Sequence, residues 1–144
     1  MKQLFKLSII IIVLSTSCQA QKLVQKSDDA KKLEINKDKF VGKPLKVLLA
    51  QIAPKIIFVY GNPDNQSLNT VGGTYLKFHF VEKAEYLHRD SKKQKPTGII
   101  VNFQLDPNNS HKPLPSGGLK EWTNEHTQEY GDMIVINLRV TGEN

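Results

Sequence analysis

One stretch of the chain alternates apolar and polar residues with a period of two, and it constrains the fold more than any other feature. It runs from Gly72 to Glu82 (GGTYLKFHFVE). Successive side chains of a strand point to opposite faces of a sheet. The residues predicted to face a core are Leu76, Phe78 and Phe80. The residues predicted to face solvent are Tyr75, Lys77, His79 and Val81.

Three further segments have the pattern of strands. Lys55–Tyr60 is dense in β-branched and aromatic residues, and Gly61–Asn65 after it is a strong turn signal. In Thr97–Leu105 the residues expected on the inner face are Ile99, Val101, Phe103 and Leu105. In Met133–Val140 the residues expected to face inward are Ile134, Ile136, Leu138 and Val140. Alternation with a polar outer face is typical of an antiparallel sheet with one side in water.

An amphipathic helix is predicted before these strands. Pro44 suits a first helical position, and Pro54 ends the pattern. The apolar stripe between them consists of Leu45, Leu48, Leu49 and Ile52. A helix this short needs an apolar surface to pack on. We therefore expect a two-layer α+β domain, with one amphipathic helix packed on a four-stranded antiparallel sheet, in the order α-β-β-β-β. The order resembles the cystatin-like arrangement in architecture alone, which carries no function.

Residues 1–20 have the pattern of an export signal. Lys2 and Lys6 precede an apolar run that ends at Leu14, and small polar residues follow. The run is shorter than the roughly 20 residues that span a bilayer as a helix. Cys18, the only cysteine, follows Ser17 and resembles the lipid-attachment cysteine of a bacterial lipobox, although Ser15 stands where leucine is usual.

Two kinds of processing remain open. In a lipoprotein, cleavage before Cys18 would leave a lipid-anchored protein in the bacterial cell envelope, facing the periplasm. Ordinary cleavage after Ala20 would discard Cys18 and give a soluble periplasmic or secreted protein. In either case the mature domain has no disulfide, so its core must be held together by burial. An unpaired thiol is unusual in a secreted protein, which favours the lipoprotein.

The mature chain is expected to be a single domain behind a tether. Residues 21–32 are polar and lysine-rich, which predicts a flexible tether, and residues 33–144 are enough for one compact domain. Leu33 and Ile35 alternate with polar residues and predict a short edge strand. The charged segment 82–96 is expected to be a connection, with Tyr86 and Leu87 extending one side of a hairpin.

The charge of the chain does not indicate nucleic-acid binding. The formal net charge is +6, and removal of Lys2 and Lys6 with the signal lowers it to +4. Arginine occurs only at Arg89 and Arg139, and no motif combines aromatic and basic residues as nucleic-acid-binding domains do. Scattered lysines are typical of a solvated surface or one that faces anionic headgroups.

The long connection from Asp106 to Asp132 is the predicted location of function, since long loops in compact domains are usually functional or disordered. The candidate ligand or partner contacts are Trp122, Tyr130, His126 and Glu125. Alternatively, Trp122 and Leu119 could anchor a short helix onto the core.

No complete catalytic or metal-binding set is present. The four histidines are far apart and lack the short spacing of zinc motifs, and no serine has a nucleophile-elbow context. We therefore expect no cofactor, and a non-catalytic domain that binds an envelope protein or another envelope component. The alternative is a periplasmic hydrolase that uses histidine and carboxylates from the 106–132 loop. For glycosidic chemistry a carboxylate pair could come from Asp64, which precedes that loop, or from Asp106, Glu121, Glu125 and Glu129 within it.

Overall fold

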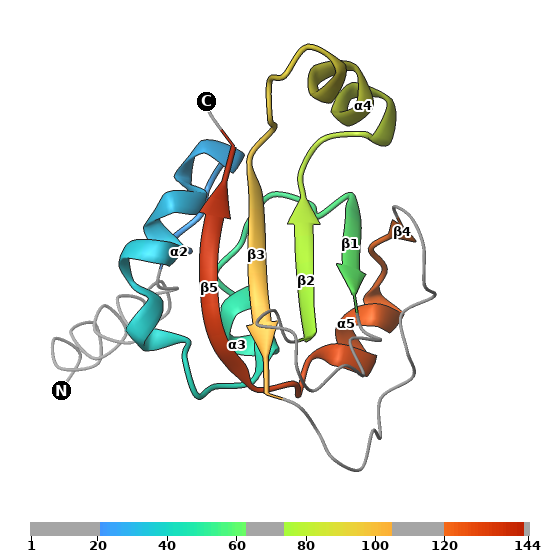
Figure 1. The fold of residues 1–144 in the computed structure, drawn as a ribbon. Coiled ribbons are helices and arrows are strands. Elements are labelled where there is room, and N and C mark those ends of the chain that lie inside the picture. The colour runs from blue at the N-terminus through green and yellow to red at the C-terminus, as the bar shows by residue number, and fades with distance from the viewer. Residues whose placement is uncertain (1–20, 63–73, 105–119, 143–144) are drawn as a thin grey trace, which may run out of the picture.

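The computed structural model describes residues 21–62, 74–104 and 120–142, which form an α+β domain around an antiparallel sheet (Figure 1). The five strands lie in the order β4-β1-β2-β3-β5. The strands are β1 (Phe58–Asn62), β2 (Thr74–His79), β3 (Gly98–Phe103), β4 (Lys120–Glu121) and β5 (Val135–Thr141). The α-helices are α2 (Lys31–Ile35), α3 (Leu45–Leu49), α4 (Lys83–Ser91) and α5 (Asn124–Tyr130). Two 3-10 helices, η1 (Ser27–Ala30) and η2 (Lys37–Lys39), flank α2.

The α+β class and the antiparallel sheet are confirmed, but the detail of one helix on four strands is not. The four expected strands correspond to β1, β2, β3 and β5. The two-residue β4 is too short to give a periodic pattern, and it pairs with β1 at Phe58 and Val59. The other helices are short, and their residues are mostly polar, so hydrophobic periodicity did not reveal them.

The strand register divides the sheet into an inner and an outer face. One inner row across β1, β2, β3 and β5 is Val59, Phe78, Ile99 and Val140. The neighbouring outer row is Tyr60, Lys77, Ile100 and Arg139. The inner face packs on α3, whose Leu45 and Leu48 are fully buried in the same core as Phe78. Figure 1 shows α3 behind the sheet and α2 beside β5, so the face turned to the viewer is the outer one.

A β-bulge changes the predicted orientation of β5. Asn102 pairs with Asn137, but the next residue, Phe103, pairs with Val135, so Ile136 has no opposite partner. One extra residue in a strand shifts the alternation by one position. Val135 is therefore fully buried, whereas Ile136 is 49% exposed. The prediction that Ile136 faces inward was wrong, while that for Leu138, on the other side of the bulge, is confirmed.

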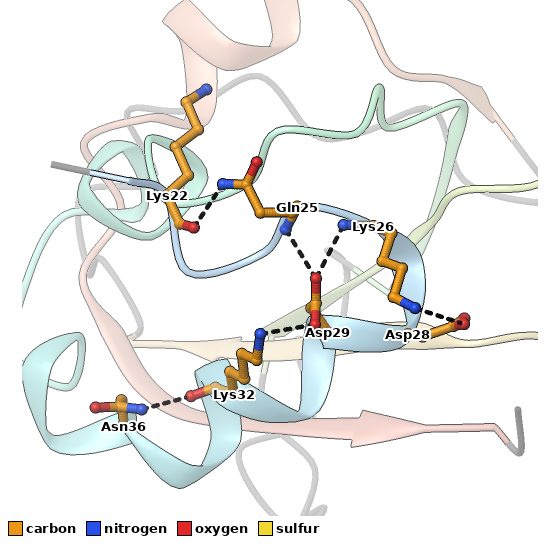
Figure 2. A network of polar contacts seen from close by, with 7 residues as sticks. All are labelled: Lys22, Gln25, Lys26, Asp28, Asp29, Lys32 and Asn36. Atoms are coloured by element: carbon orange, nitrogen blue, oxygen red, sulfur yellow. Dashed lines mark hydrogen bonds and ion pairs between the residues drawn. The ribbon is translucent and has the colours of Figure 1, made fainter. Parts of the chain in front are cut away.

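Residues 21–32 are part of the folded domain, in contrast to the expected tether. Val24 forms a parallel bridge with Ile52, and Val24 and Ala30 are both fully buried. The carboxylate of Asp29 accepts hydrogen bonds from the backbone N–H groups of Gln25 and Lys26, each at 3.2 Å (Figure 2). It also pairs with Lys32 at 2.7 Å.

The segment that follows is α2, where the sequence had predicted a short edge strand. Leu33 is fully buried, while Ile35 is 76% exposed. The alternation of two apolar residues is thus also compatible with one turn of a helix. Figure 1 shows α2 running alongside β5, so this edge of the sheet is covered by a helix.

The segment between β2 and β3 forms α4 rather than one side of a hairpin. No residue of α4 is buried, and an ion pair of 2.6 Å joins Arg89 to Glu85 one turn earlier. Such pairs stabilise exposed helices modestly. Tyr86 lies on this helix, and Figure 1 places α4 at the end of the sheet where β2 leads to β3.

Candidate functional site

The predicted contact residues of the long connection gather around α5. Thr123 caps the helix, because its Oγ1 accepts a hydrogen bond of 3.3 Å from the backbone N–H of His126. Trp122, His126 and Tyr130 follow one another at intervals of four residues, which places their rings in one row. The ring centroids are 5.5 Å apart for Trp122 and His126 and 6.2 Å apart for His126 and Tyr130.

This row belongs mainly to the core. Trp122 is 8% exposed and meets Phe78 edge-to-face at 5.0 Å, and its backbone N–H donates to the carbonyl of Ile57. Tyr130 is also buried, whereas His126 is half-buried and Glu125 is exposed. The structure therefore brings three of the four predicted residues together and directs the largest of them inward. Their role in binding stays a prediction.

A cavity of about 430 Å³ lies beside Trp122, between α3 and the start of α5. Its apolar lining includes Leu49, Ile52 and Ile56, and its volume falls in the usual range of ligand pockets. Lys46 also lines it, but this ammonium pairs with Asp132 at 2.6 Å. Neither His126 nor Glu125 lines this cavity, so it lacks the titrating pair that the hydrolase hypothesis needs.

The outer face of the sheet is the other candidate, and we call it the tyrosine face. It comprises Tyr60, Tyr75, Lys77, Ile100 and Arg139, which lie at adjacent positions of β1, β2, β3 and β5. The rings of Tyr60 and Tyr75 are 6.3 Å apart, and Tyr60 is 42% exposed. Burial raises the pKa of the Tyr75 hydroxyl, and a hydrogen bond with Tyr60 raises it further. The two phenols thus form a joined, partly exposed aromatic pair.

An aromatic cluster of the buried Phe58 and His79 and the half-buried Tyr86 borders the tyrosine face where α4 reaches the sheet. His79 stacks on Phe58 at 4.6 Å, and Tyr86 of α4 meets the His79 ring at 4.7 Å. The prediction that His79 is a solvated residue was wrong, since it is 1% exposed. The cause is α4, which the sequence pattern did not reveal. Desolvation and, to a lesser extent, the nearby charge of Lys77 together lower the pKa of His79 to about 4, so the ring is neutral near pH 7.

Lys77 occupies space that a glycine leaves open. A Cβ atom on Gly98 would lie 3.0 Å from Cε of Lys77 and 3.1 Å from Cε1 of His79. The lysine stem therefore crosses Gly98 beside the His79 ring. Partial burial lowers the pKa of Lys77, the charges of Lys95 and Arg139 lower it too, and Asp90 opposes this. Two other cations and one carboxylate thus act on Lys77 at the tyrosine face.

The described residues offer no support for metal chemistry or for a membrane span. No group of three or more histidine, cysteine, aspartate or glutamate residues in them is arranged to hold a metal ion. Within the same ranges, every helix is too short or too polar to cross a bilayer. Cys18, Asp64, Asp106 and Leu119 lie outside the described residues.

Comparison with known proteins gives no family assignment. No family model matches the chain, and neither the curated proteins nor the solved structures contain a significant match.

The sequence pattern does not identify the tyrosine face as a site, although it contains part of the signal. The alternation in β2 had already placed Tyr75 and Lys77 on the outer face. What it could not supply was the strand order, which sets Tyr60 of β1 and Arg139 of β5 into one row with Lys77. A row of this kind depends on pairings between segments that are distant in the sequence.

Proposed function

We propose that the protein is a small, exported, lipid-anchored protein of the bacterial cell envelope whose domain binds an envelope component without catalysis. The export signal and Cys18 support the location and the anchor. The tyrosine face supports the binding role. This face, rather than the 106–132 connection, is the surface through which we propose that the domain binds.

One observation carries this proposal: partly exposed tyrosines and two cations, Lys77 and Arg139, lie on the same face of paired strands. Tyrosine is enriched in binding surfaces because it offers a large contact area with few rotatable bonds. Tyr60, Tyr75 and Lys77 belong to β1 and β2, which pair over five positions. Binding groups on paired strands are held more rigidly than groups on loops, so little conformational entropy is lost when a partner binds.

The test is co-sedimentation of the mature protein with envelope fragments that have been washed with detergent. Detergent removes the contribution of the lipid anchor, so we expect the wild type and a form that starts at Gln21, which has no anchor, to sediment equally well. Tyr60→Ala should weaken binding about tenfold, as expected for a residue that contributes much of the contact energy. Ile35→Ala, which changes an exposed apolar residue of α2 away from the outer face of the sheet, should bind like the wild type.

The anchor is checked in the same preparations. The wild type should enter the detergent phase with a mass that exceeds the bare chain by a lipid, and Cys18→Ala should not. A mature N-terminus at Gln21 would contradict the anchor. Failure of the wild type to sediment, or equal binding by Tyr60→Ala, would contradict the proposed binding surface.

A further inference from the structure

The tyrosine face contains a half-buried cation that lacks an anionic partner at ion-pair distance in the described part of the chain. Lys77 forms none of the ion pairs found there; it lies among the charges of Lys95 and Arg139, and the carboxylate of Asp90 acts on it only from beyond ion-pair distance. Desolvating a charge without pairing it costs free energy. An anionic ligand at this position would recover part of that cost, which makes the face complementary to negative charge.

The neighbouring tyrosines add a requirement beyond charge. Tyr60 and Tyr75 form the aromatic end of this surface, and Tyr60 is exposed enough to contact a ligand. The C–H faces of sugar rings pack on aromatic rings, and phenol hydroxyl groups exchange hydrogen bonds with sugar hydroxyls. Asn137 is exposed on the same face of the sheet and supplies an amide. Together, the tyrosine rings, the amide and the cations fit a ligand that carries both sugar rings and acidic groups.

The shape of the surface fits an extended polymer. Adjacent strands are about 4.8 Å apart, so the row from Tyr60 through Lys77 and Ile100 to Arg139 spans roughly 14 Å. That is the length of a short oligosaccharide. A lipid bilayer is less well matched, because Lys77 lies over Gly98 instead of projecting into solvent. A chain laid along the row could reach it.

We infer that the tyrosine face binds an acidic polysaccharide, with sugar rings on Tyr60 and Tyr75 and with carboxylate or phosphate groups on Lys77 and Arg139. The inference rests on the proposed function and names its ligand class.

The test measures binding of the full mature protein in detergent to polygalacturonate. Neutral dextran and poly-L-glutamate serve as comparison polymers, since the first lacks the charge and the second lacks the sugar rings. We expect measurable affinity for polygalacturonate that weakens as salt is added, and much weaker binding to both comparison polymers. Tyr60→Ala and Lys77→Gln should each weaken binding about tenfold.

A charge-matched control separates the site from the general basic charge. Lys39→Gln removes one exposed cation in η2 and should change the affinity less than about twofold, since exposed charges act weakly at a distance. Thermal unfolding of Lys77→Gln near that of the wild type shows that the variant is folded. If Lys77→Gln is unstable, Tyr60→Ala still tests the binding site, because Tyr60 is exposed and its truncation should leave the fold intact.

The outcomes distinguish this inference from the proposed function. Binding to envelope fragments without binding to polygalacturonate would overturn the polysaccharide and leave the binding surface in place. Equal affinity for poly-L-glutamate, or variant-sensitive binding to phosphatidylglycerol vesicles in place of the polymer, would also overturn it. A loss in Lys39→Gln as large as in Lys77→Gln would show general charge attraction instead of a site.

Discussion

Replacing Trp122 with alanine is expected to lower the free energy of unfolding by about 3–5 kcal/mol, as for other large aromatic residues removed from a core. Trp122 is 8% exposed and packs edge-to-face on the fully buried Phe78. It also lies against the rings of His126 and Tyr130, so its removal would leave a cavity at the junction of α5 and the sheet. Denaturant unfolding of the mature protein measures the effect.

Ile136→Ala is the matched control for this prediction. Ile136 is 49% exposed because of the bulge in β5, so its truncation should cost less than about 0.5 kcal/mol. Comparing the free energies of unfolding of the two variants also tests the strand register, because a large loss for Ile136→Ala would mean that Ile136 faces the core. If Trp122→Ala were nearly as stable as the wild type but no longer bound envelope fragments, Trp122 would be a contact residue, as expected from the sequence.

Lowering the pH from 7 to 5 is expected to destabilise the protein by about 2 kcal/mol through His79 alone. The pKa of His79 is about 4 in the folded state, against an ordinary value of 6.5. Between these values the unfolded chain binds the proton more readily than the folded chain. Stability therefore falls as the pH decreases through this window, and the full loss approaches about 3 kcal/mol near pH 4.

His79→Phe isolates this contribution, because it keeps an aromatic ring between Phe58 and Tyr86 and removes the titrating group. The measured quantity is the change in the free energy of unfolding between pH 7 and pH 5, and the absolute stability of the variant is not compared. The carboxylates with lowered pKa values, Asp29, Glu34 and Glu85, lose their contributions only below their ordinary values of 3.8 and 4.5. If the stability of the wild type changed with pH no more than that of His79→Phe, this result would contradict the claim that His79 is buried and neutral in the folded protein.

The sheet was predictable from the sequence because its main strands bury one face. Phe78 and Leu76 were assigned to the core by their spacing, and both are buried. The bulge at Ile136 was not predictable, since a single extra residue leaves no mark in an apolar run. Its effect is local: Leu138 keeps its expected orientation and Ile136 does not.

The candidate site was harder to predict from the sequence than the sheet, for two physical reasons. Trp122 was identified as important, but whether an aromatic side chain points inward depends on neighbours such as Phe78 that are distant along the chain. His79 was placed on the correct face of its strand, yet the burial of that position depends on α4, whose charged sequence does not indicate what it covers.

The most direct test of the tyrosine face as the binding surface is the chemical labelling of lysines with and without envelope fragments. Partial burial and the nearby cations lower the pKa of Lys77, which increases its neutral, reactive fraction. Acetylation of Lys77, measured by mass spectrometry with Lys39 as the internal reference, should decrease several-fold when the protein is bound, while Lys39 is labelled as before. Unchanged labelling of Lys77 in the bound protein would contradict the account.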